Sequence, residues 1–195
     1  MADGRNKEFL RDPLNFFKTY FLCINDTTLR SGVLDVDLVN TPDPDRDIII
    51  ESYAKRTHGF TAQPIHAYLL PAIFNDISTL VLGDEAPYMF TSQLSGCMFA
   101  AYGPDSKHVT VEHVNAKYPE QATVTINERI AQILGQNYPF CKIVRFGSER
   151  STDTQYYYPA YAAVMGILTD TGDWNFYLKQ DADIQEPELF TDAFT

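Results

Sequence analysis

Hydrophobic and polar residues alternate over several short stretches, a pattern typical of β-strands that are buried on one face. The clearest alternation lies in residues 32–39, where three apolar side chains alternate with Asp35 and Asp37. Further strands are predicted in residues 48–53, 67–70, 79–82, 97–102, 108–114, 140–145 and 156–168. Because strands outnumber helices and are joined by turns, the pattern predicts an α+β fold in a single domain.

Two segments have helical spacing instead. In residues 7–22, aromatic and leucine side chains recur at near-helical intervals, but Pro13 interrupts them and predicts a short or broken helix. Residues 125–134 predict a second helix, with Thr125 or Asn127 as the N-cap.

Turn residues predict two hairpins. Residues 103–107, Gly-Pro-Asp-Ser-Lys, have the composition of a five-residue hairpin loop between the strands 97–102 and 108–114. A second hairpin is predicted around the turn at residues 170–173.

The first hairpin can bring a thiol and an imidazole together. Suppose that Tyr102 and His108 form the last pair before the loop. Cys97 then lies directly opposite His113, with their Cβ atoms about 5 Å apart. His108 would lie about 17 Å from Cys97 and point to the other face. A bulge or a four-residue loop would pair Cys97 with Glu112 instead, so the loop geometry decides between these registers.

A cysteine beside a histidine is a candidate nucleophile, since a thiol attacks an amide only as its thiolate. Gly96 precedes Cys97 and leaves room for a substrate carbonyl near the backbone amides. The backbone at Ser95, Gly96 and Cys97 is therefore the expected source of oxyanion donors. A cysteine in an apolar strand is also commonly a small core residue, so spacing alone leaves both interpretations open.

Residues 90–97 read Phe-Thr-Ser-Gln-Leu-Ser-Gly-Cys and are followed by His113. This motif resembles the active-site segment of the Burkholderia lethal factor family of bacterial toxins. Its Leu-Ser-Gly-Cys element is also similar to that of the cytotoxic necrotizing factors. The resemblance covers roughly residues 88–116 and implies that Cys97 is the nucleophile, His113 the base and Thr91 a third site residue. The connection between cysteine and histidine is longer here than in the lethal factor, so His108 stays an alternative base.

Both families are glutamine deamidases. The resemblance therefore implies that the protein is a virulence toxin or effector with hydrolase activity. It would convert a glutamine carboxamide of a host protein to glutamate through a thioester. The resemblance also implies a sandwich of mixed β-sheets flanked by helices. The implied target is a translation-initiation helicase, whose loss would inhibit translation, or a small GTPase. A papain-like protease and a transglutaminase share the thioester intermediate, and a non-catalytic acidic interaction domain is the alternative from another class.

Composition and charge exclude some classes of binding partner. The chain has 195 residues, enough for one well-buried core, and a formal net charge of −11 that argues against nucleic acid or an anionic membrane as partner. The protein is expected to be a monomer that acts on a protein substrate. No cofactor and no metal are expected, because the residue spacings typical of metal sites and phosphate-binding loops do not occur. Residues 1–181 are expected to form the catalytic domain and residues 182–195 an acidic, mobile tail.

Cysteine usage and hydropathy indicate the cellular location that is expected. Three widely spaced cysteines, Cys23, Cys97 and Cys141, fit reduced thiols in a cytosol. The N-terminus is too polar for a secretory signal, and apolar runs are too short to span a membrane. The resemblance to bacterial toxins implies synthesis in a bacterial cytoplasm and action in a host cytosol, and any export would use a route that the sequence does not display.

Overall fold

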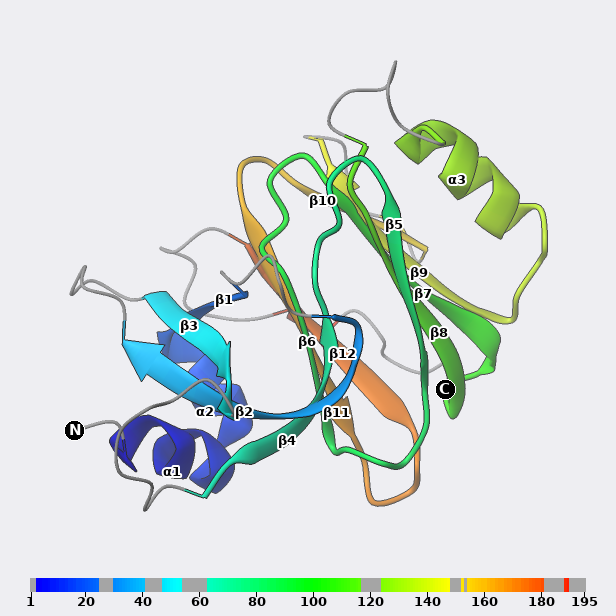
Figure 1. Cartoon of the computed structure of the whole chain (residues 1–195). Helices are drawn as coiled ribbons and strands as arrows, with labels where there is room; N and C mark the ends of the chain where they lie inside the picture. The colour runs from blue at the N-terminus through cyan, green and yellow to red at the C-terminus, as the bar shows by residue number, and fades with distance from the viewer. Residues whose placement is uncertain are drawn as a thin grey trace.

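Two mixed β-sheets make up most of the computed structural model, which describes residues 3–24, 30–40, 47–53, 63–116, 124–147, 152, 154–180 and 188–189 (Figure 1). In chain order the elements are α1 (Asp3–Arg11), α2 (Pro13–Thr19), β1 (Phe21–Ile24), β2 (Gly32–Asn40), β3 (Asp47–Ser52), β4 (Ile65–Leu70), β5 (Ile77–Leu82), β6 (Tyr88–Thr91), β7 (Met98–Asp105), β8 (His108–Val114), α3 (Ile126–Leu134), β9 (Phe140–Phe146), β10 (Gln155–Tyr158), β11 (Ala162–Leu168), β12 (Trp174–Gln180) and β13 (Glu188–Leu189).

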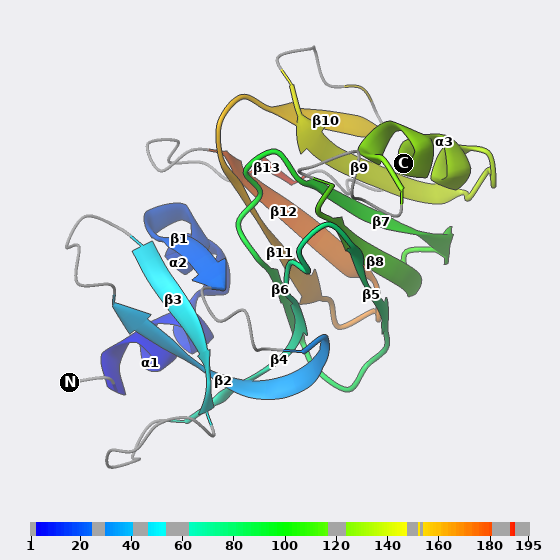
Figure 2. The same ribbon diagram turned by 45° about the horizontal axis from the view of Figure 1, so that its top comes forward.

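The elements stack in four layers. An eight-stranded sheet has the order β1-β3-β2-β4-β6-β11-β12-β13, and a five-stranded sheet has the order β10-β9-β7-β8-β5. Helices α1 and α2 cover the outer face of the larger sheet, and α3 covers the outer face of the smaller one (Figures 1 and 2). The main hydrophobic core lies between the sheets. This confirms the predicted single α+β domain, a sandwich of mixed sheets flanked by helices.

The N-terminal helices are separated where the sequence predicts a break. Asp12 is the N-cap of α2 and accepts a hydrogen bond from the Asn15 amide at 3.1 Å, while Pro13 occupies the first helical position. Phe9, Phe16 and other aromatic residues of both helices pack against the larger sheet. The predicted broken helix is therefore two helices that meet at Pro13, with residues 21–24 forming β1.

Helix α3 begins at the predicted cap. The Thr125 hydroxyl accepts a hydrogen bond from the Glu128 amide, and the Glu128 carboxylate accepts one from the Thr125 amide, which is a complete capping box. Its inward face buries Ile130 and Ile133 against the smaller sheet. Both the position and the cap of this helix match the prediction.

A charged network holds α3 on the sheet. Arg129 donates to both carboxylate oxygens of Glu112 in β8, at 2.8 and 2.5 Å, and Tyr102 in β7 donates to the same carboxylate at 2.7 Å. The Glu112 side chain is 2% exposed, so its charge is stabilised by these donors in place of water. The network fixes β8 relative to α3.

The β7–β8 hairpin is confirmed, but its loop and register differ from the prediction. Asp105 pairs with His108, so Ser106 and Lys107 alone form the loop, and a bulge follows Tyr102. The bulge depends on Gly103, since a Cβ there would lie 1.9 Å from the His108 carbonyl oxygen. The predicted five-residue loop is therefore wrong, and with it the pairing of Tyr102 with His108.

The second hairpin and the C-terminal segment complete the larger sheet. Strands β11 and β12 pair antiparallel up to Leu168 and Trp174, which confirms the predicted turn at residues 170–173. Residues 182–195, expected to be a mobile tail, lie outside the described residues except for Glu188–Leu189. These two form β13 and pair with β12, while the mobility of the rest stays a prediction. None of the helices in the described ranges has the length and apolar character needed to cross a membrane.

The Glu112–Arg129 pair yields a stability prediction. Replacing Arg129 with alanine leaves a buried carboxylate without its cation, so we expect a loss of about 2–4 kcal/mol in the free energy of unfolding, measured by urea denaturation. The control is Gln132→Ala, which removes an exposed contact of the same arginine and should cost less than about 0.5 kcal/mol. Equal losses in the two variants would contradict a structural role for the pair.

Candidate active site

Thr91 and His113 meet between the two sheets. Thr91 ends β6 in the larger sheet, and His113 lies in β8 of the smaller one. The Thr91 Oγ1 and His113 Nδ1 atoms are 2.8 Å apart, and the two residues are 1% and 0% exposed. A buried polar contact therefore links the sheets through two residues that the motif singled out.

The direction of this hydrogen bond fixes the histidine tautomer. Thr91 Oγ1 donates its single proton to the Leu70 carbonyl oxygen at 3.0 Å. With this proton on the Leu70 side, we assign the Nδ1–H of His113 as the donor to the Thr91 oxygen, which leaves Nε2 unprotonated. Nε2 is buried and has no hydrogen-bond partner among the described residues. It carries a lone pair that can accept a proton.

Cys97 lies on the same side of its sheet as His113, but not directly opposite it. The register pairs His113 with Phe99, so the predicted direct pairing of Cys97 and His113 is wrong. Cys97 immediately precedes β7, two residues from Phe99, and both face the core between the sheets. Cys97 and His113 therefore lie on the same face of adjoining segments, two positions out of register, and Nε2 of His113 makes no hydrogen bond to the Cys97 thiol.

His108, the alternative base, lies elsewhere. It is at the hairpin end of β8, five residues from His113, and its Nδ1 lies 2.8 Å from an Asp105 carboxylate oxygen. Its side chain is 72% exposed. The arrangement therefore favours His113 over His108 as partner of Cys97.

Tyr158 of β10 holds the segment that carries the cysteine. Its hydroxyl accepts a hydrogen bond from the Gly96 amide at 3.0 Å and donates one to the Cys97 carbonyl oxygen at 2.7 Å. Leu94 adds a two-bond bridge to Ala162, with N···O distances of 2.8 and 3.0 Å. The backbone on both sides of Gly96 is thus fixed before any substrate arrives.

Gly96 is required by its backbone conformation and opens the site to solvent. Its φ of +93° is rarely adopted by residues with a side chain, and a Cβ there would meet no atom within 4 Å. Its amide, however, already donates to Tyr158. Its predicted role as an oxyanion donor would require Tyr158 to give way, and this role and that of the exposed Ser95 backbone stay predictions.

Burial determines how these groups ionise. Desolvation lowers the pKa of His113 to about 4, so its imidazole is neutral at neutral pH. Burial, with a smaller contribution from Cys97, raises the pKa of the Tyr158 phenol, which stays a hydrogen-bond donor. The site at rest therefore holds a neutral base, and a stable imidazolium beside a thiolate is disfavoured.

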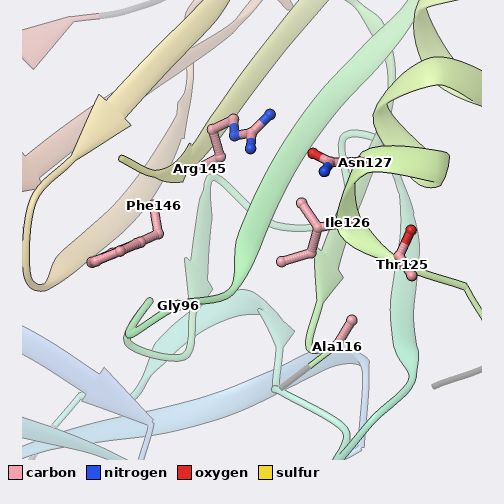
Figure 3. A pocket seen from close by; sticks show the side chains of 7 residues that line it. All are labelled: Gly96, Ala116, Thr125, Ile126, Asn127, Arg145 and Phe146. Carbon is pink, nitrogen blue, oxygen red and sulfur yellow. The ribbon is translucent and has the colours of Figure 1, made fainter. Parts of the chain in front are cut away.

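A pocket of about 370 Å³ opens beside the cysteine segment. It lies where Gly96 leads into β7, where β9 ends and where α3 begins (Figure 3). Its lining consists of Gly96, Ala116, Thr125, Ile126, Asn127, Arg145 and Phe146. Through Gly96 the pocket adjoins Cys97, so it is the candidate substrate site.

The sequence did not single out Tyr158 or Arg145. Tyr158 lies in a run of three tyrosines typical of strand packing, and its contact with Gly96 spans 62 positions along the chain. Only the pairing of β9 with β7 and β10 brings these residues to the cysteine. Within the described residues, no group of three His, Cys, Asp or Glu side chains is placed to hold a metal ion.

Comparison with known proteins finds likeness among solved structures. No protein-family model matches the chain, and no curated protein matches it. It is similar to the crystal structure of the C-terminal domain of CNFy, a cytotoxic necrotizing factor, from Yersinia pseudotuberculosis. The TM-score is 0.48 at 9% identity, with 97% of this chain and 96% of that chain covered.

Replacing Tyr158 with phenylalanine tests whether its hydroxyl clamps the backbone at Gly96 and Cys97. The ring stays, but the Gly96 amide and the Cys97 carbonyl lose their partner, so we expect a loss of about 1–3 kcal/mol in the free energy of unfolding. Tyr161→Phe is the matched control, since Tyr161 is 49% exposed, and should change stability by less than about 0.5 kcal/mol. Urea denaturation measures both, and a Tyr158→Phe variant as stable as the control would refute the clamp.

The lowered pKa of His113 predicts a pH dependence of stability. Below the usual pKa of 6.5 the unfolded chain takes up a proton at this histidine, whereas the folded chain does so only near pH 4. Stability from this residue is therefore present above about pH 6.5 and is lost as pH falls toward about 4, with about 2 kcal/mol lost by pH 5.

The measurement is the difference in unfolding free energy between about pH 7.5 and pH 5. Between these pH values, His113→Gln should lose about 2 kcal/mol less unfolding free energy than the wild type. His108→Gln, which changes an exposed histidine of the same strand, should behave as the wild type. Identical losses in wild type and His113→Gln would contradict a neutral, buried His113.

Proposed function

We propose that the chain is a cysteine-dependent glutamine deamidase that acts on a side-chain carboxamide of a protein. The observation that carries this proposal is the Thr91–His113 hydrogen bond, which leaves an unprotonated Nε2 on the face that also holds Cys97. A neutral imidazole near a thiol supplies the general base and the nucleophile that attack on an amide requires. The motif resemblance selects deamidation among the reactions that such a dyad performs.

The proposed reaction uses His113 as a proton carrier. His113 Nε2 removes the proton of Cys97 Sγ while the sulfur attacks the carboxamide carbon. The resulting imidazolium donates that proton to the leaving nitrogen, which departs as ammonia, and a thioester remains. His113 then deprotonates a water that attacks the thioester, and the proton returns to sulfur as glutamate is released. Thr91 keeps Nδ1 protonated throughout, so that Nε2 always faces the reaction.

Burial of His113 shapes this cycle. Because desolvation disfavours the imidazolium, proton removal from the thiol is expected to accompany attack on the carbonyl and not to precede it. The base is then fully active at neutral pH and stays so down to about pH 5. A histidine with the usual pKa of about 6.5 would already be largely protonated there.

The surroundings of Cys97 suit a side-chain amide. Cys97 is only 8% exposed, and the open side of Gly96 leads to the adjoining pocket of about 370 Å³. A site of this size accommodates a side chain and its immediate neighbours. Papain-like cleavage, transglutamination and a purely non-catalytic interaction role are the alternatives that the experiment below must separate. A host helicase or small GTPase as target remains a prediction from the resemblance.

Mass spectrometry of a treated lysate tests the activity. A eukaryotic lysate incubated with the wild type should contain glutamine-to-glutamate conversions that are missing after incubation with Cys97→Ser. His113→Gln should reduce the rate by at least about 100-fold. New peptide termini would indicate proteolysis, amine incorporation would indicate transglutamination, and no change of any kind would leave the non-catalytic role.

Two substitutions at Thr91 test the tautomer control. Thr91→Val removes the acceptor for Nδ1–H while keeping the side-chain shape, and we expect the deamidation rate to fall at least about tenfold because the ring can adopt the other tautomer. Thr91→Ser keeps the hydroxyl and should retain most of the activity. Equal rates in Thr91→Val and Thr91→Ser, measured by ammonia release, would rule out this role for the hydroxyl.

A further inference from the structure

Arg145 is a cation at the pocket whose charge has no anionic partner in the described part of the chain. It lies in β9 directly opposite Met98, the residue that follows Cys97. It lines the pocket together with Gly96 on one side and the start of α3 on the other (Figure 3). Its Nε is buried and has no hydrogen-bond partner among the described residues. A buried N–H in this state is costly unless a ligand supplies an acceptor.

The guanidinium lies near an aromatic ring. Its Cζ atom lies 5.8 Å from the centre of the Tyr157 ring. A cation–π contact at this distance leaves the N–H edges of the guanidinium available to a planar acceptor. A carboxylate accepts two parallel hydrogen bonds from such an edge.

The charges around the pocket favour an anion there and oppose one elsewhere. The other lining residues are uncharged. Glu128, the carboxylate in the first turn of α3, accepts hydrogen bonds from the amide and hydroxyl of Thr125 and so is committed to the helix cap. The chain as a whole has a net charge of −11, which repels acidic proteins in general. An acidic ligand is therefore attracted locally and not by the overall charge.

We propose that Arg145 is a specificity-determining residue, which binds the carboxylate of an aspartate or glutamate close to the target glutamine. The inference rests on the proposed function, because it assigns the pocket to the chain around that glutamine. Arg145 shares the α3 face of the smaller sheet with Met98, whereas Cys97 faces the core between the sheets, so the substrate chain that joins the two sites would pass Gly96 at the end of the sheet. A phosphorylated side chain offers the same anionic oxygens, and the experiment separates the two sources.

Binding of labelled peptides tests the proposal independently of turnover. Fluorescein-labelled peptides carry one central glutamine flanked by glutamate, phosphoserine, alanine or lysine, and polarisation measures their affinity for the Cys97→Ser protein. The glutamate peptide should bind about tenfold more tightly than the alanine peptide, as one charge-assisted pair provides. Adding Arg145→Gln should reduce this ratio to about one. Arg11→Gln, the same charge change on the exposed end of α1, should leave the ratio intact.

The outcomes are distinct. Equal affinity for the glutamate and alanine peptides, or a ratio that survives Arg145→Gln, overturns the inference. A clear preference for phosphoserine over glutamate overturns the assignment to a carboxylate and identifies a phosphate instead. Incubating the same peptides with wild type separates the two proposals. Conversion without preference for the glutamate peptide refutes the role of Arg145 alone, whereas Arg145-dependent binding without conversion refutes deamidation alone.

Discussion

The hydrogen bond between Thr91 and His113 is the contact on which the proposed chemistry depends. It crosses from one sheet to the other, and both of its residues are buried. With the Thr91 proton donated to Leu70, the bond runs from the Nδ1–H of His113 to the Thr91 oxygen and selects one histidine tautomer. The same burial keeps the imidazole neutral. A single buried contact thus sets the position, the tautomer and the charge of the base.

The remaining layers of the fold hold the partners of this contact in place. Tyr158 fixes the backbone at Gly96 and Cys97 from the edge strand of the smaller sheet. On the other face of β8, Glu112 adjoins His113 in sequence and is bound by Arg129 of α3. The helix therefore restrains the strand that carries the base.

Much of the architecture could be predicted because it depends on local signals. Pro13 marks a helix boundary, the Thr125 and Glu128 pair marks a helix start, and the turn at residues 170–173 marks a hairpin, each through contacts within a few residues. The candidate residues of the motif were also named from the sequence, and two of them are in contact. Their chemical roles are proposals that rest on this geometry.

What could not be predicted depends on geometry between distant segments. The predicted register of the first hairpin was wrong because Gly103 permits a bulge. The bulge shortens the loop and shifts the pairing by two residues at Cys97. Asp37, expected on a polar face, is 1% exposed because Asn6 of α1 donates to it. Tyr158 and Arg145 reach the site through strand order alone. Such pairings leave no periodic trace in the sequence.

The central claim is that His113 is a neutral histidine protonated at Nδ1, with an unprotonated Nε2. Nitrogen-15 NMR of the imidazole reports this directly, because protonated and unprotonated ring nitrogens resonate far apart. We expect Nδ1 at the protonated position and Nε2 at the unprotonated position, unchanged from about pH 7.5 down to about pH 5. A protonated Nε2, or a ring that titrates near its ordinary pKa of about 6.5, would contradict the account.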